Sequence, residues 1–197
     1  TSSRSAFFSR LAPTRARIAL AFSFAIAVLL LASASASATV NTVRYASPTG
    51  TGSSAICAQA DPCSLADATD SFEVFDGDEV ILAPGTYALG ASEFAIEDAI
   101  DVHGSGPASA TKLVSTAPTY MRALSLDNGA SLSNLELEAV SGIGVHDGSL
   151  TNVVAKSSQG LSCLLSGPAT LVNTACTTAA YGAAAIVIGD QTPNTVI

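Results

Sequence analysis

Three short stretches near the C-terminal end repeat one pattern: LSN at Leu132–Asn134, LTN at Leu150–Asn152 and LVN at Leu171–Asn173. The copies begin 18 and then 21 residues apart, and a glycine follows each Asn by eight or nine residues. These glycines are Gly142, Gly160 and Gly182. One copy is too short to bury a core alone, so a period of this length is typical of a solenoid whose repeats stack on their neighbours. The many Leu, Val, Ser and Thr residues predict that the stacked elements are β-strands.

Placing the three Asn in register produces columns of two kinds. Two columns are mostly apolar: Leu135 with Val153 and Thr174, and Leu137 with Ala155 and Cys176. The alternate positions form mixed columns: Glu136 with Val154 and Ala175, and Glu138 with Lys156 and Thr177. Because side chains alternate across a strand, the first kind predicts the core face and the second the solvent face. The same register brings Lys156 close to Glu138, which predicts an ion pair between repeats.

The Asn column has two interpretations. Stacked copies lie one strand spacing apart, about 4.8 Å, so the side-chain amides of Asn134, Asn152 and Asn173 can join into a ladder. We interpret this ladder as structural, with hydrogen bonding to a saccharide as the alternative. Aligning the repeats on their glycines predicts a further apolar strand in each repeat. Its columns are Ile143 with Leu161 and Ala183, and Val145 with Cys163 and Ala185.

The N-terminal residues have the pattern of an export signal. Four arginines (Arg4, Arg10, Arg15 and Arg17) precede an apolar run of 15 residues, Ile18–Ala32, and small residues follow it at Ser33–Ala38. This order predicts a secretory signal peptide over residues 1–38, with an uncleaved membrane anchor as the alternative. We therefore expect a protein that is secreted or held at the cell surface, with a mature chain that is not embedded in a membrane.

Removal of the signal peptide would leave four basic residues against sixteen acidic ones, a net charge of −12. The remaining cations, Arg44, Lys112, Arg122 and Lys156, are scattered along the chain. Such a chain has no basic patch to bind a phosphate backbone, which excludes nucleic acid as a partner. The sequence leaves the oligomeric state open.

All four cysteines follow the predicted cleavage site. Cys57 and Cys63 flank a short polar loop that contains Pro62, which predicts a local disulfide in an oxidising compartment. For Cys163 and Cys176 the sequence leaves both a disulfide and buried thiols open. Directly after Cys63, Ser64 is a candidate N-cap for one short helix that would cover the first end of the solenoid.

The beginning of the predicted solenoid resembles a known family. CSLADA at Cys63–Ala68 is similar to the CSLREA motif that opens many secreted bacterial β-helix proteins, although Ala66 replaces its arginine. With GDEVILAPGTY at Gly77–Tyr87 and VHGSGP at Val102–Pro107, it resembles the entry into right-handed parallel β-helix proteins of the pectin-lyase-like superfamily. The resemblance implies an all-β, right-handed parallel β-helix. We expect a cap with the disulfide and the short helix at residues 39–75, and rungs at residues 76–197 that are incomplete at the C-terminal end.

No group of residues forms a convincing catalytic, cofactor or metal site. Glu136 and Glu138 lie two residues apart on one side of a strand, as an acid and base pair would, but Lys156 is expected beside them. The cluster Asp76, Asp78 and Glu79 could bind calcium, but we interpret it as an ordinary acidic loop and predict no cofactor. His103 and His146 lie beside glycine turns, and no nucleophile accompanies them.

The sequence therefore predicts an exported β-helix that acts as a structural or binding module at the cell surface, in contact with saccharides or other surface partners. The alternative is a polysaccharide lyase or glycoside hydrolase whose active site lies beyond residue 197. The fold permits either function, so the sequence leaves enzymatic activity open, and the residues present favour a protein that is not an enzyme.

Overall fold

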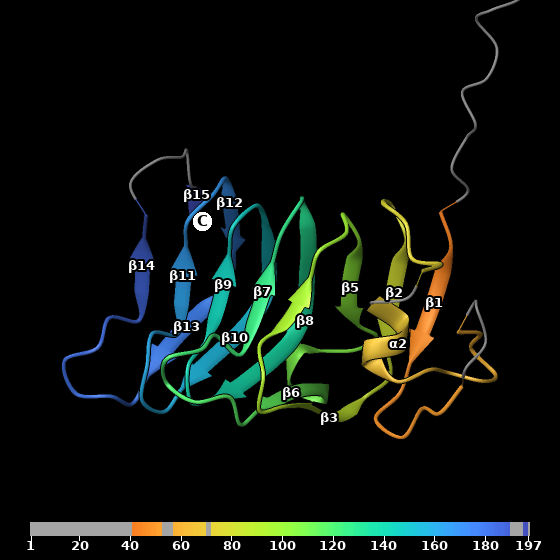
Figure 1. Ribbon diagram of the computed structural model, residues 1–197, viewed down its shortest axis with the longest axis horizontal. Helices are drawn as coiled ribbons and strands as arrows, with labels where there is room; N and C mark the ends of the chain where they lie inside the picture. The colour runs from red at the N-terminus through yellow and green to blue at the C-terminus, as the bar shows by residue number, and fades with distance from the viewer. Residues whose placement is uncertain (1–40, 53–56, 70–71, 190–194, 197) are drawn as a thin grey trace, which may run out of the picture. The chain divides into compact units, whose positions relative to one another are not determined.

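Parallel strands stack coil upon coil into a β-solenoid (Figure 1). The computed structural model describes residues 41–52, 57–69, 72–189 and 195–196, which all belong to one compact unit, Val40–Ile197. The predicted signal peptide lies outside these residues. The described strands form a ten-stranded sheet and a five-stranded sheet. Within each sheet every pair of neighbouring strands is parallel, as the repeat predicted.

The ten-stranded sheet bends into two faces. The strands of the first face are β1 (Val43–Ala46), β2 (Glu79–Leu82), β5 (Asp101–Gly104), the beginnings of β8 (Ala130–Ala139) and β10 (Gly148–Ser157), β12 (Ala169–Val172) and β15 (Thr195–Val196). The strands of the second face are β3 (Gly85–Gly90), β6 (Thr111–Ser115), the ends of β8 and β10, and β13 (Ala175–Thr178). A short 3-10 helix, η1 (Ala108–Ala110), precedes β6.

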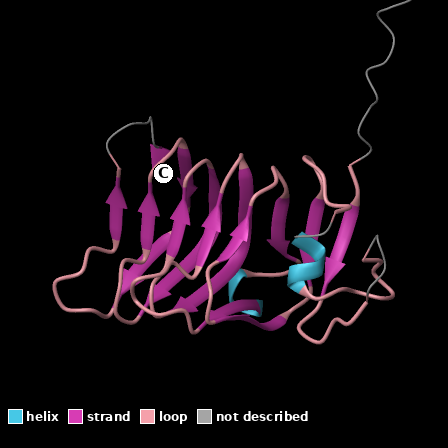
Figure 2. Cartoon of the chain, in the orientation of Figure 1, coloured by secondary structure: helices cyan, strands magenta, loops and turns pink. Residues whose placement is uncertain are grey.

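The five-stranded sheet is the third face, which Figure 2 shows as the row of upward arrows in front. Its strands are β4 (Phe94–Ile96), β7 (Leu124–Leu126), β9 (Ile143–Val145), β11 (Cys163–Leu165) and β14 (Ile186–Ile188). The inward side chains of the three faces meet in one core, in which Leu124, Leu132 and Leu137 are fully buried.

The register of the first two faces is the one that the Asn column predicted. Leu150 pairs with Leu132 and Leu171, and Ala155 pairs with Leu137 and Cys176. The alignment on the glycines was wrong for the third face. Cys163 pairs with Ile143 and Ile186, and Leu165 pairs with Val145 and Ile188.

The error on the third face comes from corner loops of unequal length. Ile143 directly follows Gly142, whereas Leu161 and Ser162 separate Gly160 from β11. The backbone nitrogens of Gly142 and Ile143 donate to the carbonyl oxygens of Leu161 and Ser162, at 2.7 and 2.8 Å. Glycines that look equivalent in the sequence therefore occupy different places in their coils.

A short helix, α2 (Leu65–Thr69), packs against β1 and β2 at the first end of the solenoid. The hydroxyl oxygen of Ser64 accepts a hydrogen bond from the backbone nitrogen of Asp67 at 3.1 Å, and the hydroxyl donates to the carboxylate of Asp67 at 2.7 Å. The first bond satisfies one of the backbone N–H groups left free at the start of the helix, and the second fixes the hydroxyl of Ser64 in place. Its apolar side is buried by Leu65 and Ala68. Since α2 lies beside the edge strand β1, it covers part of the end that stacked strands leave open.

Candidate functional site

The three repeated asparagines form a ladder along the corner between the first and second faces. Asn152 donates a side-chain hydrogen bond to the side-chain oxygen of Asn134 at 3.0 Å, and Asn173 donates to Asn152 at 2.6 Å. All three have a left-handed backbone, with φ between 48° and 56°. Asn tolerates this conformation better than most residues, and here it also supplies the bonds between coils. Because these amides bond to one another, the ladder explains the repeat as a structural feature.

Replacing Asn152 with alanine should lower the free energy of unfolding by about 1–3 kcal/mol, because it removes two ladder bonds and because alanine tolerates the positive φ less well than asparagine does. Asn152→Gly also removes the bonds but tolerates the backbone conformation, so it should cost less. Urea unfolding of the two variants measures both contributions. Equal stability of Asn152→Ala and the parent protein would contradict a structural role for the ladder.

Four charged side chains form a network of ion pairs on the outside of the second face. Lys112 of β6 donates to Glu138 at 2.9 Å, and Lys156 of β10 donates to Glu136 at 2.9 Å. Lys156 also lies 3.9 Å from Glu138, so the predicted pair exists, although its closer carboxylate is Glu136. The two glutamates are thus partners of lysines, and the geometry favours an ion-pair network over an acid and base pair.

These contacts change the pKa values of two members of the network. The hydrogen bond from Lys112, with smaller contributions from the charges of Lys112 and Lys156, lowers the pKa of Glu138. The hydrogen bond to Glu136 raises the pKa of Lys156. Both side chains are largely in solvent, where water and salt weaken such interactions, so the network contributes modestly to stability.

The lowered pKa of Glu138 predicts a small pH dependence of stability. Its contribution is present above the ordinary glutamate pKa and is lost as the pH falls through the lower value of the folded protein. Melting temperatures of the parent protein and Glu138→Gln should therefore differ most near neutral pH and converge in acid. The matched control is Glu97→Gln, because Glu97 is exposed and forms no ion pair among the described residues. A difference that persists unchanged into acid would contradict the prediction.

The outside of the first face carries two columns of hydroxyl side chains. One column contains Ser131, Ser149 and Thr170, which pair in register on β8, β10 and β12. Ser133 and Thr151 form the second column beside it. Toward the first end of the solenoid, the second column continues through His103 and Ile81 to Tyr45. The face therefore combines regularly spaced hydroxyls with an aromatic and apolar end.

The histidines and acidic residues singled out in the sequence lie apart. The Nε2 atom of His103 is 2.7 Å from the Oε1 atom of Glu79, whereas the Nδ1 atom of His146 is 3.6 Å from the carboxylate of Asp127. Asp76 accepts a hydrogen bond from the backbone nitrogen of Ala99. The candidate calcium ligands Asp76, Asp78 and Glu79 thus have separate partners. In the described residues, no three His, Cys, Asp or Glu side chains come close enough to hold a metal ion.

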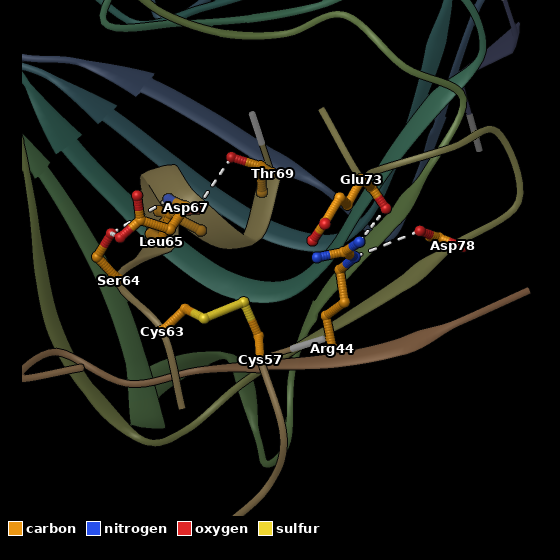
Figure 3. The surroundings of a disulfide bond; sticks show 9 residues. All are labelled: Arg44, Cys57, Cys63, Ser64, Leu65, Asp67, Thr69, Glu73 and Asp78. Carbon is orange, nitrogen blue, oxygen red and sulfur yellow. Dashed lines mark hydrogen bonds and ion pairs between the residues drawn. A yellow bond between two sulfur atoms is a disulfide. The ribbon is translucent and has the colours of Figure 1, made fainter. Parts of the chain in front are cut away.

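Asp78 is a buried hydrogen-bond acceptor and ion-pair partner, a role that its local sequence did not indicate. Its side chain accepts hydrogen bonds from the backbone nitrogens of Thr42 and Phe75 and lies 3.3 Å from the Nε atom of Arg44. Arg44 also donates to the backbone oxygen of Glu73 (Figure 3). Only 2% of each charged side chain is exposed. The pair ties β1 to the segment before β2 inside the cap.

Both cysteine pairs form disulfides. Cys57 and Cys63 are joined beside Arg44 and α2 (Figure 3), and Cys163 of β11 is joined to Cys176 of β13. The second bond connects the third face to the second face through the core, which decides between the two states that the sequence left open. Two disulfides fit an oxidising compartment outside the cytoplasm.

A hollow of about 350 Å³ lies over the third face. Its lining includes Arg122, which donates a hydrogen bond to Glu93 at 2.9 Å, and Tyr120, 85% of which is exposed. A Cβ atom at Gly144 would meet the Cδ atom of Arg122 at 2.4 Å, so the glycine makes room for the arginine. This contact was not expected from the sequence, although a glycine inside a strand can indicate that another group approaches the backbone closely.

Comparison of the chain with protein-family models, with curated proteins and with solved structures finds no match. Across the part of the chain that the structure describes, no helix has the length and apolar character needed to cross a membrane.

Proposed function

We propose that this chain is an exported β-solenoid that acts as an extracellular or cell-surface binding and structural module, and that its first face contacts extended saccharides. The observation that carries the proposal is the pair of hydroxyl columns, one of Ser131, Ser149 and Thr170 and the other of Ser133 and Thr151. Their spacing of about one strand, 4.8 Å, is comparable to the length of one residue in an extended glycan. Regular hydroxyls on a rigid surface can bond to a polymer that is itself regular and rich in hydroxyls.

Other observations support an extracellular setting. Two disulfides suit an oxidising compartment, and the strongly acidic composition keeps a protein soluble there. The N-terminal pattern of arginines and apolar residues favours export. The proposal includes right-handed coiling and membership of the pectin-lyase-like superfamily, both supported by the CSLREA-like start of α2 and the parallel coils that follow it.

Binding to immobilised glucan, mannan and galactan tests the proposal. The double variant Ser133→Ala/Thr151→Val removes two outward hydroxyls of the first face and retains side chains that suit a strand. Loss of two hydrogen bonds should weaken binding roughly tenfold. The matched control Thr86→Val/Thr177→Val makes the same kind of change on the second face and should bind as the parent does. Absence of binding to all three polymers, or equal weakening by both variants, would contradict the proposed face.

A further inference from the structure

The first face ends in a walled hollow of about 170 Å³ at the capped end of the solenoid. Tyr45 and Ile81, neighbours on β1 and β2, contribute outward side chains to its lining. The disulfide loop contributes Gln59 and Pro62, and the ends of β2 and β5 are followed by Pro84 and Ser105. The rest of the lining is Ala46 and Ala83. This hollow lies at the end of the column that begins with Thr151 and Ser133.

The wall beyond Tyr45 is held firmly in place. The backbone nitrogen of Tyr45 donates to the carbonyl oxygen of Cys57 at 2.7 Å, and the nitrogen of Cys63 donates to the carbonyl oxygen of Tyr45 at 3.0 Å. The disulfide closes the loop between these two points, and a turn from Asp61 to Ala58 completes it. A loop fixed at both ends loses little conformational freedom when a ligand binds.

The lining has the chemistry that a sugar ring requires. Tyr45, Ile81 and the two prolines offer apolar surface to the C–H groups of a ring, whereas Gln59 and Ser105 offer hydrogen-bond donors and acceptors. The side chains of Gln59, Ser105 and Tyr45 form no hydrogen bond with the described residues, so their polar atoms are available to a ligand. The pair His103 and Glu79 lies next along the face.

The charges near the hollow favour a neutral sugar over an anionic one. Glu79 and Asp101 both point outward on this part of the first face and are substantially exposed. The cations of the described residues lie elsewhere, since Arg44 is buried with Asp78 and Lys112 and Lys156 are on the second face. Arg122 lies against Gly144 of the third face. An anionic sugar would therefore meet repulsion without a compensating cation, and a neutral one would not.

We propose that this hollow is a subsite for the end of a neutral saccharide chain: one pyranose ring rests against Tyr45, Ile81 and Pro62, and the chain continues along His103, Ser133 and Thr151. The inference rests on the proposed saccharide-binding function and deepens it. The loop at Gln59 and Pro62 closes the path beyond Tyr45, so the subsite receives a chain end and not the middle of a chain.

The test measures the binding of gluco-, manno- and galacto-oligosaccharides of increasing length, with oligogalacturonate as the anionic comparison, to the full chain by calorimetry. Tyr45→Ala should weaken binding of the neutral oligosaccharide that the parent binds best by roughly tenfold, and Gln59→Ala by a smaller factor. Tyr120→Ala is the matched control, because this exposed tyrosine lies over the third face. It should leave affinity unchanged. Thermal melts establish that each variant is folded.

The outcomes separate the subsite from the proposed function. If Tyr45→Ala and Gln59→Ala bind like the parent while Ser133→Ala/Thr151→Val binds weakly, the subsite is wrong and the saccharide-binding face stands. If oligogalacturonate binds more tightly than every neutral oligosaccharide, the charge argument is wrong and the subsite with it. If the parent binds no saccharide, both proposals fail. A bulky group that weakens binding when attached at one end of the chain, but not at the other, would support recognition of a chain end.

Discussion

Replacing Asp78 with alanine should lower the free energy of unfolding by about 3–5 kcal/mol. The change leaves the guanidinium of Arg44 buried without this carboxylate, and it removes the acceptor for the backbone nitrogens of Thr42 and Phe75. A charge that loses its partner in the interior costs more than an exposed pair ever contributes. Urea unfolding followed by circular dichroism measures the effect.

Two variants show whether burial causes the loss. Asp101→Ala removes an exposed carboxylate that accepts one hydrogen bond from Ser131, and it should cost less than about 1 kcal/mol. Asp78→Asn keeps an oxygen acceptor and should fall between the two. If Asp78→Ala and Asp101→Ala lower stability equally, the cap does not depend on the buried pair.

The second large effect concerns the core. Leu132 is fully buried on β8 between Val102 of β5 and Leu150 of β10. Leu132→Ala should lower the free energy of unfolding by about 2–5 kcal/mol, because it leaves a cavity between coils that cannot collapse without shifting their strands. The control Leu164→Ala, on the outward side of β11, should cost about 1 kcal/mol or less. Similar losses from both substitutions would contradict the assignment of inward and outward positions.

The predicted solenoid depended on one local feature that repeats in the sequence. Each Asn turns a corner with positive φ, so the residues on either side keep the same distance from that corner in every coil. This is why aligning Asn134, Asn152 and Asn173 predicted the pairing of the first and second faces residue by residue. The glycines failed as markers because the loops around them differ in length, so their positions along the coil vary.

Contacts between distant segments were harder to predict. Lys112 reaches Glu138 because β6 pairs with β8, yet 26 residues and loops of irregular length separate the two. Arg44 and Asp78 are 34 residues apart, and each looks like an ordinary surface charge in its local sequence. The hollow beside Tyr45 combines the disulfide loop with residues of β1 and β2 and with residues that follow β2 and β5, so no single stretch of sequence reveals it.

The sequence by itself determined the parallel stacking, the direction in which side chains of the Asn-anchored strands point, and the positions of the corner asparagines. These properties follow from strand periodicity and from the backbone preference of Asn, which act over a few residues. Only the tertiary structure decided the register of the third face, the pairing of Cys163 with Cys176, the buried partner of Arg44 and the walled end of the first face. Each of these depends on where loops of unequal length place distant residues, and burial then makes the resulting contacts strong.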